Sequence, residues 1–241
     1  MEPIAANLDA IRARIDAACR AAGRPPTSVR LLPVSKTRPV ADLRSAIAAG
    51  YTRFGENKVQ ELEAKASALA DVPGLEFVMI GHLQSNKAKL VAALASEFQA
   101  LDSIPLAAEL DRRLRSLDRG LDVLIQVNSS GEASKFGLAP EAVLDFARAL
   151  SPFDALRVRG LMTLALPSPD PERVAACFAR MQRLRRLLRD AALPGQSYDE
   201  LSMGMSGDFE LAIAHGATQV RIGTGIFGVR GRPAAGPAPS Q

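Results

Sequence analysis

A lysine and two glycine-rich turns are the residues of this chain whose types point to shared chemistry. Lys36 ends an early apolar segment, Leu31-Leu-Pro-Val-Ser-Lys36. Two apolar segments far downstream end in Met203-Gly-Met-Ser-Gly207 and Gly223-Thr-Gly225. A lysine amine forms an imine with an aldehyde, and turns rich in glycine offer backbone N–H groups to a phosphate. The combination indicates a cofactor that carries both groups, as pyridoxal phosphate (PLP) does.

Short apolar strands alternate with amphipathic helices along most of the chain. We predict eight strands, over residues 29–35, 52–55, 76–80, 98–101, 122–127, 157–162, 200–203 and 219–222. A helix is predicted over residues 4–22, and others begin near Pro39, Lys58, Asn86, Ser103, Pro140, Asp170 and Asp208. Ser103 and Asp170 are the expected N-caps. Alternating units of this kind form a parallel sheet, and eight of them favour a closed (β/α)₈ TIM barrel with an extra N-terminal helix.

The chain reads as one domain, because no Gly/Ser-rich linker divides the alternating pattern. The barrel is predicted to occupy residues 1–230. Residues 231–241 are rich in Pro, Ala and Gly, and we expect them to form a disordered tail.

The composition is that of a globular protein with a sizeable core. Hydrophobic residues make up 47% of the 241 residues, and the mean hydropathy is +0.04. The net charge is +4, and much of this excess lies on the predicted helix around residues 180–189, where it is typical of a solvated helix face. With two Tyr and no Trp for base stacking, nucleic-acid binding is disfavoured.

The cysteines and the N-terminus indicate a protein of the cytoplasm. Cys19 and Cys177 fall in helical patterns without the spacing of metal ligands, so free buried thiols and no metal site are expected. No apolar run reaches the ~18 residues of a membrane span. The first residues lack the basic start and apolar stretch of a signal peptide.

In a barrel of this kind, functional groups gather at the carboxyl ends of the strands. Lys36 is therefore expected at the mouth, where apolar surroundings would favour a nucleophilic amine, although a solvated loop lysine is the simpler alternative. Phosphate sites in such barrels use the loops after strands 7 and 8 and a short extra helix. The two glycine-rich turns occupy these places, and Ile226-Phe-Gly228 is a candidate for the extra helix.

Seven motifs in order resemble the YggS/PROSC family, the pyridoxal phosphate homeostasis proteins, over residues 29–230. They are Val34-Ser-Lys-Thr37, Phe54-Gly-Glu-Asn57 with Val59-Gln-Glu61, Ile80-Gly-His-Leu-Gln-Ser-Asn-Lys87, Ile125-Gln-Val-Asn128, Gly160-Leu-Met-Thr163, Leu201-Ser-Met-Gly-Met-Ser206 and Val220-Arg-Ile-Gly-Thr224. The resemblance implies a barrel like the N-terminal domain of alanine racemase.

The family resemblance also implies roles for individual residues. It identifies Lys36 as the residue that holds PLP as a Schiff base. The expected phosphate ligands are Ser206, Gly223 and Thr224, and Arg221 is expected to face the pyridine nitrogen. Asn57 and Met203 are expected walls of the site. For His82, a contact at the mouth and a place in the core are both open.

By resemblance, the function is PLP binding for vitamin B6 homeostasis without catalytic turnover. Arginine cannot accept the proton of the pyridine ring, which weakens the cofactor as an electron sink, but alanine racemases also have an arginine at this place. Those racemases use a tyrosine from an additional domain that we do not expect here. The alternatives are a PLP enzyme of the alanine racemase type and a barrel that binds a phosphate ligand without an imine. We expect a monomer whose partners are PLP and PLP-dependent apo-enzymes, without nucleic acid or membrane.

Overall fold

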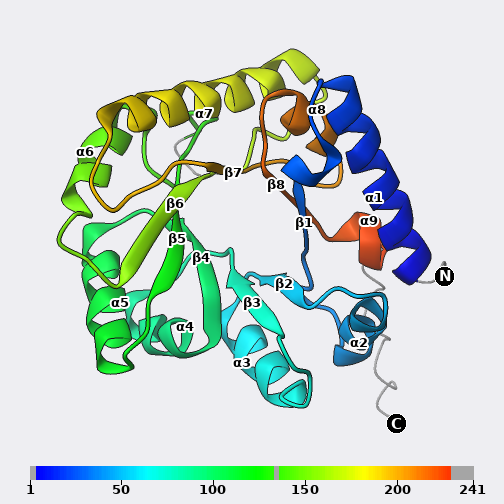
Figure 1. The fold of residues 1–241 in the computed structure, drawn as a ribbon, viewed down its shortest axis with the longest axis horizontal. Coiled ribbons are helices and arrows are strands. Elements are labelled where there is room, and N and C mark those ends of the chain that lie inside the picture. Colours follow the sequence, from blue (N-terminus) through cyan, green and yellow to red (C-terminus); the bar gives the residue numbers. More distant parts are fainter. Residues whose placement is uncertain (1–3, 133–135, 229–241) are drawn as a thin grey trace, which may run out of the picture.

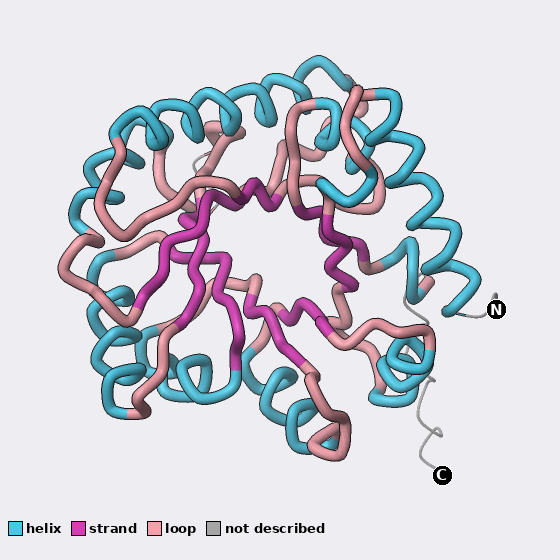
Figure 2. Tube along the Cα trace, in the orientation of Figure 1, coloured by secondary structure: helices cyan, strands magenta, loops and turns pink. Residues whose placement is uncertain are grey.

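Eight parallel strands form the inner ring of the molecule in the computed structural model, which describes residues 4–132 and 136–228. Their order around the ring is β1-β8-β7-β6-β5-β4-β3-β2, and a bridge between Val34 and Gly55 joins the first strand to the second. Figure 2 shows the strands as an inner ring surrounded by helices. The strands are β1 (Arg30–Pro33), β2 (Arg53–Glu56), β3 (Glu76–Met79), β4 (Ala95–Leu101), β5 (Leu121–Gln126), β6 (Leu156–Met162), β7 (Glu200–Ser202) and β8 (Gln219–Ile222).

The helices follow the strands in turn and cover the outside of the barrel (Figure 1). Apolar side chains from strands and helices make one continuous core between the two layers. The α-helices are α1 (Ile4–Ala21), α2 (Val40–Ala48), α3 (Val59–Ala68), α4 (Ala88–Leu94), α5 (Ile104–Ser116), α6 (Val143–Ala149), α7 (Pro171–Ala191), α8 (Phe209–Ala214) and α9 (Thr224–Phe227), with 3₁₀ turns at Pro26–Ser28, Ser85–Lys87 and Pro140–Ala142.

The predicted (β/α)₈ barrel is confirmed, with all eight strands near their predicted positions. The largest difference is β4, which begins at Ala95 rather than at Phe98. Helix α4 ends at Leu94, so the chain passes directly from helix to strand. The added residues include Glu97, whose buried side chain faces other strands rather than solvent.

The two predicted N-caps are also confirmed. Ser103 Oγ accepts a hydrogen bond from the backbone N–H of Leu106 at 3.3 Å, at the start of α5. Asp170 Oδ1 accepts from the backbone N–H of Glu172 at 2.9 Å, at the start of α7. Both side chains satisfy a first-turn donor that has no partner within its own helix.

The extra N-terminal helix is present and packs against the last part of the barrel. Helix α1 lies beside α8 and α9 (Figure 1). Its inner face buries Leu8, Ile11 and Ile15. The Asn7 side chain donates to the backbone oxygen of Ile226 at 2.9 Å, which ties α1 to α9. The helix therefore supports the β8–α9 loop from outside.

Three further predictions concern the cysteines, the C-terminal tail and membrane spans. Cys19 and Cys177 are free and buried, as predicted. The predicted tail, residues 231–241, lies outside the described residues, as do the outermost ends of the predicted 1–230 domain. None of the helices in the described ranges combines the length and hydrophobicity needed to cross a membrane.

Candidate cofactor-binding site

Lys36 stands at the mouth formed by the carboxyl ends of the strands. It follows β1 just beyond the bridge between Val34 and Gly55. Lys36 begins the turn after this bridge, and the loop after β8 lies beside the same part of the chain: a Cβ at Gly223 would be 3.2 Å from the backbone oxygen of Val34. The lysine side chain is partly buried. Its place directly after β1 puts it at the edge of the mouth.

A buried ion pair supports the residue before Lys36. Lys65 Nζ on α3 lies 2.6 Å from Glu56 Oε1 at the end of β2, and it donates to the backbone oxygen of Ser35 at 2.6 Å. Ser35 Oγ also donates to Glu56 Oε1, at 2.5 Å. Burial raises the pKa of Glu56, and the hydrogen bonds from Lys65 and Ser35 oppose this effect. The ion pair therefore anchors the chain at the end of β1 to α3 and β2.

The turn that follows Lys36 is held in an unusual backbone conformation. Thr37 has φ of 62°, in the left-handed region that residues with a side chain seldom adopt. Its backbone N–H donates to Glu61 Oε2 on α3 at 2.5 Å. This contact stabilises the turn and so directs the chain away from the mouth immediately after the lysine.

The loop after β7 forms one side of the mouth. Gly204 has φ of +96°, and a Cβ there would lie 2.9 Å from Phe209 Cα, so only glycine fits this turn. Ser206 Oγ accepts a hydrogen bond from the backbone N–H of Gly225 at 3.3 Å, which joins the loops after β7 and β8. Within the described residues, the backbone N–H groups of Ser206 and Gly207 have no protein acceptor. They are available to an anion.

The loop after β8 lies directly beside β1. A Cβ at Gly223 would come within 3.2 Å of the backbone oxygen of Val34, two residues before Lys36. The extra helix predicted at residues 226–228 is α9, which begins two residues earlier, at Thr224, whose side chain is exposed. The structure thus brings Gly223, Thr224 and Ser206 to the same side of the mouth as Lys36.

Arg221 is the buried cation of the site. Its side chain, on β8, is 3% exposed and hydrogen-bonds to Ser202 Oγ at 2.6 Å and to the backbone oxygen of Thr163 at 2.7 Å. Ser202 is the last residue of β7, and Thr163 directly follows β6. The guanidinium therefore lies inside the barrel, near the carboxyl ends of these strands. Burial lowers the pKa of Arg221 to about 10, and the more distant Asp208 carboxylate opposes this effect.

The two predicted wall residues differ in their exposure. Asn57 follows β2 and is partly buried, and its Oδ1 atom is buried without a hydrogen-bond partner among the described residues. Met203 is fully buried in the core, whereas the neighbouring Met205 is exposed on the β7 loop. Asn57 therefore holds a buried acceptor without a partner among the described residues, while Met203 contributes packing beneath the loop.

His82 lies at the mouth and not in the core, which decides between the two alternatives. It is exposed, and its ring stacks on that of Phe136, with centroids 4.2 Å apart and planes inclined by 16°. His82 and Lys87 line a cavity of about 240 Å³ together with Asn57. The stack joins the loops after β3 and β5.

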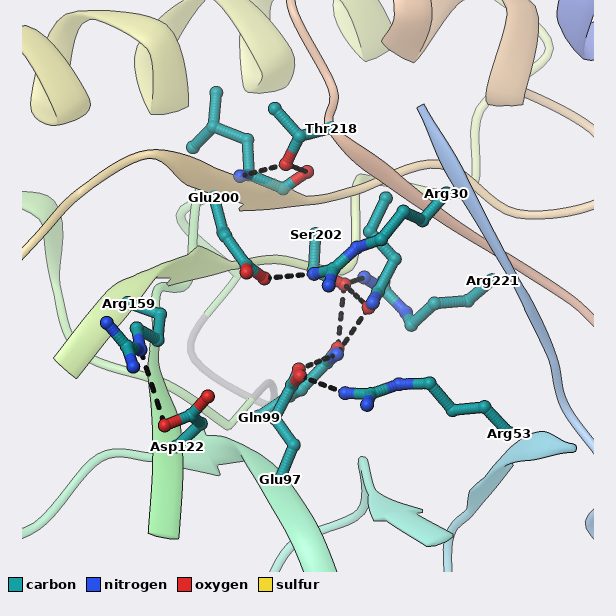
Figure 3. Close-up of polar contacts among 12 residues, drawn as sticks. Arg30, Arg53, Glu97, Gln99, Asp122, Arg159, Glu200, Ser202, Thr218 and Arg221 are labelled. Carbon is teal, nitrogen blue, oxygen red and sulfur yellow. Dashed lines mark hydrogen bonds and ion pairs between the residues drawn. The ribbon is translucent and has the colours of Figure 1, made fainter. Parts of the chain in front are cut away.

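Sequence reasoning missed a set of buried polar side chains inside the barrel below Arg221. They are Ser202, Gln99, Gln219 and Glu97, connected by hydrogen bonds to one another (Figure 3). Their signal in the sequence is a polar residue at every second position of an otherwise apolar strand, as in Glu97-Phe-Gln99 and Gln219-Val-Arg221. This pattern places polar groups on the inner side of the ring.

The residues at the mouth fit a phosphate-bearing aldehyde. Lys36 provides an amine, the β7 and β8 loops provide backbone N–H groups and hydroxyls, and Arg221 provides a buried cation. The unpaired Oδ1 of Asn57 is a further polar atom without a partner among the described residues. A buried polar atom of this kind can be satisfied by a water molecule or by a bound ligand.

Comparison with known protein families first defines the class to which this barrel belongs. A model of the family "Alanine racemase, N-terminal domain" matches residues 6–231. The barrel is therefore one of the alanine racemase N-terminal domain type.

Similar proteins narrow the class to a family. The chain is 47% identical over 237 residues to a pyridoxal phosphate homeostasis protein of Pseudomonas aeruginosa, covering 98% of this chain and 100% of the relative. It is 44% identical over 226 residues to the protein of that name from Pasteurella multocida, covering 93% and 96%. PipY of Synechococcus elongatus, solved with PLP bound, is 37% identical with a TM-score of 0.83, covering 93% and 100%. The chain belongs to the pyridoxal phosphate homeostasis protein family.

Proposed function

We propose that this protein binds PLP at the barrel mouth and serves the homeostasis of that cofactor. The observation that carries the proposal is that the β8 loop lies against β1 two residues before Lys36, through Gly223 and Val34, and that Ser206 joins the β7 loop to it. The names of the relatives and the PLP bound in PipY support the same assignment.

Each residue at the mouth then has a role. Lys36 would hold the cofactor through its amine, as a Schiff base with the aldehyde carbon. Ser206, Gly223 and Thr224 bind the phosphate through hydroxyls and backbone N–H groups. Arg221 faces the pyridine nitrogen, and Asn57 and Met203 shape the wall.

The arrangement favours storage and delivery of PLP over catalysis. When bound, PLP supplies an electron sink for carbanions. Arg221 holds its own proton and cannot accept one from the ring. Tyr51 and Tyr198 precede β2 and β7, so both lie toward the amino ends of the strands, opposite the mouth. The proposed carrier is a monomer that supplies PLP-dependent apo-enzymes.

The absorbance spectrum of the purified protein tests the covalent link. Protein incubated with PLP should show a band near ~420 nm that borohydride removes, with a matching mass gain on the Lys36 peptide. Lys36→Ala should lack the band. Lys58→Ala is the matched control, because Lys58 is an exposed lysine two residues after the end of β2. A wild-type band retained in full by Lys36→Ala would refute the assignment of the Schiff base.

The enzymatic alternative has its own test. PLP-loaded protein incubated with amino acids in D₂O should show no exchange of the α-proton beyond that of free PLP. Exchange that depends on both the protein and Lys36 would instead establish a racemase-like enzyme.

A further inference from the structure

Among the buried charged side chains of residues 4–132 and 136–228, Arg221 is unusual because its hydrogen-bond partners are neutral. The guanidinium is 3% exposed, and it donates to the Ser202 hydroxyl and to the Thr163 carbonyl. A buried cation needs strong compensation for its lost hydration. The hydrogen bonds of Ser202 show how the charge of Arg221 is compensated.

The hydrogen bonds of Ser202 run in one direction. Ser202 is fully buried, and its Oγ accepts from Arg221 Nη1 at 2.6 Å. Its single hydroxyl proton is therefore directed to Gln99 Oε1 at 2.7 Å, in preference to Gln219 Oε1 at 3.2 Å. Ser202 thus relays the arginine bond to the amide of Gln99.

Gln99 extends the chain of hydrogen bonds to a carboxylate. Its Nε2 donates to Glu97 Oε1 and to Gln219 Oε1. Glu97 is buried and also accepts from Arg53 Nη2. The reverse orientation of the Gln99 amide would place its oxygen against the carboxylate, so the amide direction is fixed. Figure 3 shows the resulting chain from Arg221 through Ser202 and Gln99 to Glu97.

We propose that Ser202, Gln99 and Glu97 are positioning residues that fix the guanidinium of Arg221 and moderate its positive field at the ring nitrogen of bound PLP. The inference rests on the proposed PLP site. Aligned hydrogen bonds polarise one another in a medium of low dielectric. The negative end at Glu97 therefore makes Ser202 Oγ a stronger acceptor, which draws positive charge of Arg221 toward the chain and away from the mouth.

The proposal predicts an effect on the cofactor from a residue that does not touch it. Loss of the charge of Glu97 should leave Arg221 more strongly electron-withdrawing toward the pyridine ring. The imine nitrogen that would join the cofactor to Lys36 then binds its proton less tightly, so the long-wavelength absorbance band is lost at a lower pH than in the wild type. Burial raises the pKa of Glu97 and the nearby Glu200 adds to this effect, whereas Arg53, the hydrogen bond from Gln99 and Arg30 oppose it and favour the carboxylate. Asp208 acts on Arg221.

The variant Glu97→Gln, with Glu76→Gln as its matched control, tests whether the charge of Glu97 acts on the bound cofactor. Both carboxylates bind Arg53, Glu97 through Nη2 and Glu76 through Nη1, but only Glu97 belongs to the chain that ends at Arg221. In PLP-loaded protein, Glu97→Gln should move the pH midpoint of the absorbance change down by ~0.5–1 unit, the scale of one charge acting across a protein interior. Glu76→Gln should move it by less than a third of that amount.

Ser202→Ala is the second variant, and it carries the test should Glu97→Gln fail to fold. It interrupts the chain at its first link and should shift the midpoint in the same direction, with a loss of PLP affinity of about tenfold or more. Equal shifts in the two glutamine variants, or none in both Glu97→Gln and Ser202→Ala, would overturn the inference. A wild-type protein without a band that borohydride reduces would instead refute the proposed PLP site.

Discussion

Two buried cations of this barrel are stabilised in different ways. Lys65, beside β2, has its three N–H donors directed to Glu56, Ser35 and Glu61, and a carboxylate lies 2.6 Å away. Arg221, on β8, binds a hydroxyl and a carbonyl and has its carboxylate, Glu97, at the far end of a hydrogen-bonded chain. A buried cation in direct contact with a carboxylate stabilises the fold. A buried cation whose hydrogen-bond partners are neutral keeps a positive field that can act on a ligand.

Removing Lys65 should have the largest effect on stability. Lys65→Met leaves Glu56 buried without its cation, and breaking a buried pair in this way costs about 3–5 kcal/mol. Urea unfolding measures the loss. In the double variant Lys65→Met/Glu56→Gln no charge remains, so most of the stability should return. A double variant as unstable as the single one would show that Lys65 acts through packing and not through charge.

Removing Arg221 should affect stability much less and PLP binding more. Arg221→Gln takes away a buried charge without leaving a carboxylate unpaired at the same place, so the expected cost is about 1 kcal/mol. The affinity for PLP should fall about tenfold or more, because a charge-assisted contact to the cofactor is lost. PLP titration and urea unfolding of the same samples separate the two effects. A stability loss equal to that of Lys65→Met would remove the distinction between the two cations.

The sequence predicted the parts of this site that depend on one segment at a time. The order of strands and helices, the caps at Ser103 and Asp170, and the place of Lys36 after β1 follow from local patterns and from the general construction of such barrels. The glycine-rich turns after β7 and β8 were found for the same reason.

The two cation networks were missed because they depend on contacts between distant segments. Gln99 and Gln219 meet only because eight strands close into a ring with a definite stagger. Lys65 lies four residues after Glu61, which is the spacing of an ordinary exposed pair on a helix. Its burial against Glu56 and Ser35 comes from the packing of α3 on the barrel, which local periodicity does not contain.

An ion pair exposed to solvent should contribute less to stability than either buried cation, so its removal should have the smallest effect. On α5, Glu109 accepts from Arg112 at 2.7 Å and from Arg113 at 2.7 Å, and these bonds lower its pKa from 4.5 to about 2. A lowered carboxyl pKa contributes stability above pH 4.5 and loses it as the pH falls toward 2. Glu109→Gln should therefore lower the melting temperature slightly at pH 6, with the difference from wild type closing near pH 2.5. Water and salt screen exposed pairs, so 1 M NaCl should shrink the pH 6 difference. A salt-independent difference as large as that of Lys65→Met would mean that exposure does not separate these pairs.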